Sequence, residues 1–282
     1  MGEKLDKLEK EFAADVLFFY GEIQPSVLRA FRDLIEDLKK PQVPPAAPQV
    51  RLVIILNTPG GSAETVEKLV DIIRHHYEDV SFVVPDFAMS AGTIFCMAGN
   101  RIYMDYSSSL GPIDPQVWNG KQWVPARGYL DKVQELFEKE AAGNLSNAEF
   151  LILQNQDLAM LSRYEQANNL TVTLLKKWLV EYKWKDWTQH QTNPAKIGQP
   201  VTDAEKTARA EDVAKLLGDN KYWHSHGRMI GINTLRSVVR LKIEDYSNDP
   251  KLQPIIRSYN DLITEWIAKT DNRLFVHTRK FF

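Results

Sequence analysis

The sequence lacks the features that would place it in several protein classes. It has one cysteine among 282 residues, Cys96, so it can form no intramolecular disulfide and no cysteine-based zinc site. This usage suits a reducing compartment. No apolar run approaches the roughly 18 residues of a membrane span, and the charged segment Met1–Phe12 has no apolar signal-peptide core. We therefore expect a cytoplasmic protein without a membrane span.

An excess of one charge sign is also lacking. The chain has 35 Lys and Arg against 37 Asp and Glu, a formal net charge of −2, so the overall balance does not call for nucleic acid or an anionic membrane. His75 and His76 have no acidic partner at metal-ligand spacing, and we expect no metal and no cofactor. With 44% hydrophobic residues, the chain is long enough to bury a full core.

The first part of the sequence alternates between apolar, β-branched runs and segments with helical periodicity. We expect strands over 16–20, 50–56, 80–85 and 101–104, and helices over 26–39, 63–75 and 90–98. Repeated strand–helix units predict right-handed crossovers and a mainly parallel sheet, an α/β fold. Four prolines within Pro41–Pro48 predict an extended linker inside this part.

The later part of the sequence changes character after Pro115. Long helical patterns cover 129–142, 146–179, 203–217 and 250–268. Trp178, Trp184 and Trp187 are expected to pack in a core or against a neighbouring subunit. We divide the chain into residues 1–116, the first part of an α/β core, residues 117–220, a helical region for oligomerisation or capping, and residues 221–282, a segment that returns to the core and ends in a helix.

Two glycine turns follow neighbouring strands, Asn57–Gly61 with the sequence Asn-Thr-Pro-Gly-Gly and Ala88–Gly92 with Ala-Met-Ser-Ala-Gly. Both should lie at the edge where parallel sheets place ligands. Ser90 would begin a helix, where unpaired N–H groups favour a developing anion. The N–H groups of Gly61 and Ala91 can then converge on one oxygen as an oxyanion hole. The structural alternative is that Ser90 only caps the helix.

These motifs resemble a known family. Asn-Thr-Pro-Gly-Gly, Met-Ser-Ala-Gly-Thr at 89–93 and Leu-Gly-Pro-Ile-Asp-Pro-Gln at 110–116 resemble the serine dehydrogenase proteinases of the ClpP/crotonase superfamily, relatives of the Clp peptidases and of signal peptide peptidase A. The likeness covers 16–116 and, more loosely, 223–243. It implies a ClpP-like fold, a homo-oligomer, and a serine peptidase that cleaves peptides or unfolded segments through an acyl-enzyme. Ser90 would be the nucleophile, with Gly61 and Ala91 as oxyanion donors.

A serine nucleophile needs a base. No histidine occurs between His76 and His190, which closes the position that Clp-type peptidases use. The triad order of the serine dehydrogenase proteinases, Ser, Asp, His, selects Ser90, Asp114 and His226. In that arrangement His226 would take the serine proton, and Asp114 would fix the tautomer and stabilise the imidazolium.

Other assignments of the base stay open at this point. His224 competes with His226, and a Ser–Lys dyad of the signal-peptide-peptidase type would use Lys132, whose pKa burial would have to lower. Asp114 between two prolines can also simply brace a turn. Two further functions fit the fold: a crotonase-type acyl-CoA enzyme that uses the same two N–H groups, and a catalytically inactive scaffold.

Overall fold

The computed structural model describes residues 1–40, 50–191 and 194–280, and the predicted linker Pro41–Pro48 lies outside them. The fold is mixed α/β, as predicted. Its first part follows a strand–helix order: α1 (Gly2–Phe12), β1 (Asp15–Gly21), η1 (Pro25–Val27), α2 (Leu28–Lys39), β2 (Arg51–Asn57), α3 (Ala63–His76), β3 (Asp79–Val84), β4 (Phe87–Ala88), α4 (Ala91–Met97) and β5 (Arg101–Met104).

The main sheet contains six strands of the described residues, in the order β10-β5-β3-β2-β1-β11, where β10 is Glu244–Asp245 and β11 is Leu274–His277. Strands β1, β2, β3, β5 and β10 pair in parallel, so the mainly parallel sheet is confirmed. Strand β11 pairs antiparallel with β1. The sequence analysis did not predict β11, which follows the helix predicted over 250–268.

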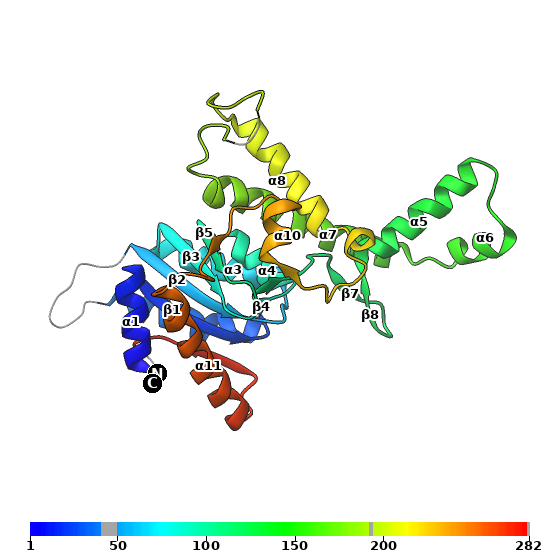
Figure 1. Ribbon diagram of the computed structural model, residues 1–282. Helices are drawn as coiled ribbons and strands as arrows, with labels where there is room; N and C mark the ends of the chain where they lie inside the picture. Colours follow the sequence, from blue (N-terminus) through cyan, green and yellow to red (C-terminus); the bar gives the residue numbers. More distant parts are fainter. Residues whose placement is uncertain (41–49, 192–193, 281–282) are drawn as a thin grey trace.

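Strand β2 shows why the central strands are apolar at every position. Leu52, Ile54 and Leu56 belong to the core shared with α2, α3 and α4, whereas Val53 and Ile55 belong to the core shared with α1 and α11 (Leu252–Thr270). Successive side chains point to opposite faces of a sheet, so helices on both faces require continuous apolar runs. Figure 1 shows α1 beside α11.

A second, smaller sheet stands between the main sheet and the helical region. Strand β4 pairs in parallel with β6 (Ser109–Leu110), and β6 pairs antiparallel with β9 (Ile230–Gly231). The next segment forms an antiparallel hairpin of β7 (Gln116–Trp118) and β8 (Trp123–Pro125). Strand β4 leads into the glycine turn at Ser90, and Asp114 lies between β6 and β7.

The helical region consists of α5 (Ala126–Ala141), α6 (Asn147–Gln154), α7 (Leu158–Trp178), the π-helical turn η2 (Leu179–Lys183) and α8 (Asp203–Leu217). The prediction of one helix over 146–179 is wrong, because the Asp157 side chain accepts hydrogen bonds from the N–H groups of Ala159 and Met160 and starts a new helix there. Trp178 is buried in the main core, as predicted. Helices α5 and α6 project away from the body (Figure 1).

The closing segment crosses back to both sheets. It contains α9 (Asn220–Trp223), β9, α10 (Ile232–Ser237), β10, α11 and β11. The polar stretch 222–231 includes the end of α9 and all of β9. No helix in the described part of the chain has the length and apolar character needed to cross a bilayer.

Candidate active site

The glycine turns open onto a cavity of about 910 Å³. Gly61, Ser90, Ala91 and His226 line it together with residues from the β7–β8 hairpin and from α7. Four of the residues singled out from the sequence therefore share one cavity. Asp114 is 1% exposed and reaches the cavity through its contact with His226.

The two turns lie side by side, as expected for neighbouring parallel strands. The Thr58 N–H donates to Phe87 O at 3.0 Å, and the Met89 N–H donates to Thr58 O at 3.0 Å. Gly60 has φ +110°, and a Cβ built on it would lie 2.9 Å from Ser90 Cβ. Only glycine permits this backbone conformation together with this approach.

Ser90 has a strained backbone and an uncommitted hydroxyl. Its φ and ψ are 52° and −116°, and although it occupies the N-cap position of α4, its side chain makes no capping hydrogen bond. Ser62, at the N-cap of α3, instead accepts from the Thr65 N–H. A strained serine at a strand-to-helix turn is the geometry of nucleophile elbows, in which the turn holds the hydroxyl out toward substrate.

Two backbone amides of the turns are free to bind an oxygen. The Gly60 N–H is engaged by Thr58 Oγ1 at 3.0 Å. Within the described residues, the N–H groups of Gly61 and Ala91 donate to no protein acceptor. Because both residues line the cavity beside Ser90, these amides can receive a ligand oxygen there without breaking an internal hydrogen bond.

Asp114 and His226 form a hydrogen-bonded pair, with 2.9 Å between Asp114 Oδ1 and His226 Nδ1. Strands β6 and β9 explain the contact. Their antiparallel register pairs Leu110 with Ile230, and four residues further along each strand, outward from this pair, the chain reaches Asp114 and His226. The pairing of Leu110 with Ile230, 120 residues apart, thus brings Asp114 next to His226, 112 residues apart.

Gln116 completes the surroundings of the carboxylate, and the sequence analysis did not assign it a role. Its Nε2 donates to Asp114 Oδ2 at 2.9 Å, so both oxygens of the buried carboxylate accept a hydrogen bond. Gln116 is the first residue of β7 and stands two residues after Asp114, so its side chain can reach back to the carboxylate.

Thr93 ties the serine turn to the segment that carries Asp114. Its buried Oγ1 donates to Ala88 O at 2.8 Å and accepts from the Gly111 N–H at 2.9 Å. The first turn of α4 is thereby fixed to the start of the Gly111–Asp114 segment. The position of the carboxylate relative to Ser90 follows from this buried link and from the β6–β9 pairing.

The two other candidate bases lie away from the cavity lining. The Lys132 side chain is 63% exposed on α5, and its ammonium group pairs with Glu135 at 2.9 Å. His224 is an exposed residue at the end of α9, with φ 62°. Neither side chain is among those that line the cavity with Ser90, and of the three candidate bases only His226 does so.

The described residues offer no cluster of His, Cys, Asp and Glu suited to a metal ion. Cys96 is fully buried, and burial raises the pKa of its thiol. Aromatic residues that the sequence did not single out lie at the mouth of the site: Trp118 and Trp123 line the cavity, with ring centroids 5.9 Å apart. Helix α7 contributes both apolar and polar side chains to the lining: Arg163, Gln166, Ala167, Leu170 and Thr171.

The chain is similar to two uncharacterized proteins of Methanocaldococcus jannaschii. It is 30% identical to MJ0137 over 142 residues, which are 50% of this chain and 46% of that protein. It is 30% identical to MJ1495 over 122 residues, which are 43% of this chain and 36% of that protein. The chain thus spans less than half the length of these relatives.

Among solved structures, the fold is similar to two of the 1510-N membrane-bound stomatin-specific protease. One is a serine-to-alanine mutant, with a TM-score of 0.46 and 13% identity, covering 85% of this chain and 82% of that one. The other is a lysine-to-alanine mutant in complex with a substrate peptide, with a TM-score of 0.47 and 14% identity, covering 84% and 76%.

A family model supplies the assignment. The model for the ClpP-like SDH-type serine proteinases matches residues 36–207, more than half of the chain. The matched range includes both glycine turns, Ser90 and Asp114, and His226 follows it in the sequence. The chain therefore belongs to the family of ClpP-like SDH-type serine proteinases.

Proposed function

We propose that this protein is a serine peptidase that hydrolyses peptide bonds through an acyl-enzyme, with Ser90 as nucleophile, His226 as base and Asp114 as the residue that orients the base. The observation that carries the proposal is the 2.9 Å contact between buried Asp114 and His226 in the cavity that Ser90 lines. The free hydroxyl of Ser90 supports it, because a capping serine would have used that hydroxyl.

In the proposed acylation step, Ser90 Oγ attacks the carbonyl carbon of the scissile peptide bond, and its proton passes to His226 Nε2. In this proposal Asp114 accepts from Nδ1–H, which leaves Nε2 without a proton and able to accept one from Ser90. The imidazolium then gives the proton to the leaving amine as the C–N bond breaks. A water molecule repeats the sequence on the ester, releases the acid and regenerates Ser90.

The amides of Gly61 and Ala91 are the proposed oxyanion hole. As the carbonyl oxygen gains negative charge, both N–H groups would donate to it, and they need no rearrangement because they hold no internal acceptor. One such donor is worth roughly 10²–10³ in rate. The crotonase alternative would use the same amides but gives no role to Asp114, His226 or the strained serine, and the peptidase reading accounts for all of them.

The substrate we propose is an extended peptide or an unfolded protein segment. The cavity is lined by Trp118 and Trp123, by residues of the first glycine turn and by apolar and polar residues of α7, which together can receive side chains and main chain of a strand-like ligand. A cytoplasmic location is our proposal for the compartment. It rests on the single cysteine.

We also propose a homo-oligomer. No residue of α6 is buried, although this helix carries Phe150, Leu151 and Ile152, each more than half exposed. Phe137 of α5 is 49% exposed, so both helices of the projecting arm (Figure 1) carry exposed apolar side chains. Light scattering after chromatography should give a multiple of 32.4 kDa that falls toward the monomer in Phe150→Glu.

Labelling with a fluorophosphonate tests the proposed mechanism. The wild type should be labelled at Ser90, and Ser90→Ala should not. His226→Gln should slow labelling strongly, whereas His224→Gln and Lys132→Ala, matched changes on the exposed candidates, should not. No labelling of a folded wild-type protein, or loss of labelling in Lys132→Ala alone, would contradict the triad.

A further inference from the structure

One side chain of helix α11 is hydrogen-bonded to the segments that carry the two glycine turns. Asn260 is 3% exposed; its Oδ1 accepts from Asn57 Nδ2 at 2.6 Å, and its Nδ2 donates to Asp86 Oδ2 at 2.9 Å. Asn57 ends β2, just before the first turn, and Asp86 stands four residues before Ser90. The amide group of Asn260 therefore spans the two segments that carry Gly61 and Ala91.

Asn57 closes this network from the other side. Its buried Oδ1 accepts from the N–H groups of Asp86 at 3.2 Å and Phe87 at 3.4 Å. Because its Nδ2 is already bound to Asn260, the side chain of Asn57 connects the helix, the end of β2 and the start of β4. Buried polar networks in which the members satisfy one another hold a single geometry.

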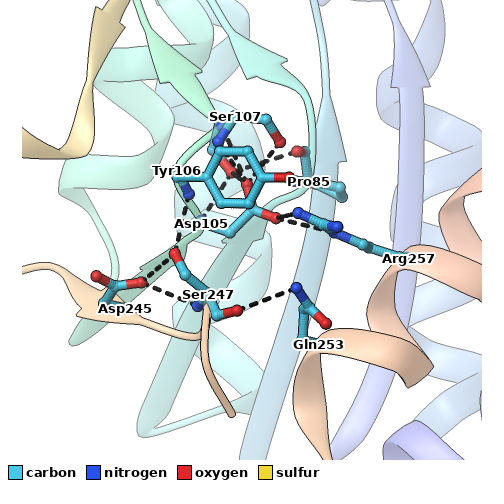
Figure 2. Close-up of polar contacts among 9 residues, drawn as sticks. Pro85, Asp105, Tyr106, Ser107, Asp245, Ser247, Gln253 and Arg257 are labelled. Atoms are coloured by element: carbon cyan, nitrogen blue, oxygen red, sulfur yellow. Dashed lines mark hydrogen bonds and ion pairs between the residues drawn. The ribbon is translucent and has the colours of Figure 1, made fainter. Parts of the chain in front are cut away.

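A second anchor lies one turn earlier in the same helix. Arg257 donates to Asp105 Oδ2 from Nη2 at 2.7 Å and from Nε at 3.1 Å (Figure 2). Burial opposes ionisation of Asp105, but hydrogen bonds from Ser107 and Arg257 outweigh it and hold the pKa of Asp105 below its usual value. A paired guanidinium–carboxylate contact is directional, so it fixes the position of α11 and thereby of Asn260.

Given the peptidase function proposed above, we propose that Asn260 is a positioning residue that keeps the Gly61 and Ala91 amides aligned on one oxygen through Asn57 and Asp86. Helix α11 lies outside residues 36–207, which match the family model. The oxyanion geometry would thus be set by a part of this chain beyond the matched range. Since misplacing a catalytic group by about 1 Å can cost 10²-fold, Asn260→Ala should lower kcat by about 10- to 100-fold, with KM changed less than about threefold.

Exchanging the amide of Asn260 and the carboxylate of Asp86 distinguishes a positioning role of Asn260 from a role in stability alone. Asn260→Asp still accepts from Asn57 but sets a second carboxylate against Asp86, and should lower kcat about tenfold or more. Adding Asp86→Asn restores a donor opposite the new carboxylate, and the double variant should return to within about threefold of wild type. Ser258→Ala, whose hydroxyl donates within the helix to Ile255 O at 3.2 Å, is the matched control.

Each variant is assayed for kcat and KM on a peptide substrate, for the rate of fluorophosphonate labelling and for Tm. Unchanged kcat in Asn260→Asp, or no recovery in the double variant while its Tm recovers, would overturn the positioning role and leave the peptidase proposal intact. If the wild type itself is neither labelled nor active, the peptidase proposal fails and the positioning role fails with it.

Discussion

Replacing Asp114 by Asn should stop proton transfer while leaving the fold in place. Asp114 Oδ2 accepts from Gln116 Nε2, and Oδ1 faces His226 Nδ1, both at 2.9 Å. Because Gln116 presents an N–H, an asparagine at this position keeps its carbonyl oxygen toward Gln116 and turns its NH₂ toward His226. The imidazole must then accept at Nδ1 and carry its proton on Nε2, which leaves no lone pair for the Ser90 proton.

The expected loss follows from this change of tautomer. Where the same exchange has been made in a Ser-His-Asp triad, kcat falls by about 10⁴, so we expect about 10³–10⁴ here, or roughly 4–5 kcal/mol of barrier. Initial rates on a peptide substrate give kcat and KM, and KM should change little because the side chain is 1% exposed and does not line the cavity.

A compensating change at Gln116 tests the reason for the loss. With Gln116→Glu added to Asp114→Asn, the new carboxylate accepts from the asparagine NH₂, so the amide oxygen turns back toward Nδ1–H and at least about tenfold of kcat should return. Gln116→Glu alone sets two carboxylates together and should reduce kcat. An active Asp114→Asn single variant, or a double variant no better than it, would refute this account of the triad.

Three further predictions concern stability. Ser90→Gly should abolish labelling yet raise the free energy of unfolding by about 1 kcal/mol in urea titrations, because glycine relieves the strain at φ 52°; a lower value would contradict the strain. Gly60→Ala should lower the free energy of unfolding by about 1–3 kcal/mol and should lower kcat at least tenfold, because the added Cβ would lie 2.8 Å from Met89 O. Wild-type kinetics in this variant would show that the two turns can move apart without loss of activity. Burial lowers the pKa of His277 from 6.5 to about 4, so between these pH values the unfolded chain binds a proton that the folded chain does not. The free energy of unfolding should therefore fall by up to about 3 kcal/mol as the pH drops from about 6.5 to about 4. His277→Gln should show a smaller fall in urea titrations, and identical pH slopes for the variant and the wild type would exclude His277 as the cause.

The sequence predicted the parallel core well because its strands are buried on both faces. A short apolar run such as Leu52–Leu56 is typical of a strand that is buried on both faces. The glycines of the first turn indicate that the strand ends before them. The helices over 63–75 and 203–217 were predicted to within a residue at most, since Ser62 and Thr202 cap them by side-chain hydrogen bonds. Local patterns of this kind are sufficient for element type and order.

Contacts between distant segments could not be read in the same way. Strands β4, β6 and β9 are two residues long, too short for any periodicity, although they bring His226 to Asp114. Only the resemblance to a family favoured His226 over His224, since both are histidines of one polar stretch. The hydrogen bond from Gln116 to Asp114 depends on the direction of a side chain only two residues away, and the contacts of Asn260 join segments more than 170 residues apart. No spacing rule predicts either contact.

The antiparallel pairing of β6 with β9 has a consequence for protein synthesis. When a nascent chain has emerged from the ribosome as far as residue 200, Ser90 and both glycine turns are already exposed, but His226 and the helix that carries Asn260 have not yet emerged. If these residues act as proposed, an emerging chain cannot cut itself or its neighbours, and hydrolytic activity begins only when the segment that carries His226 and α11 docks.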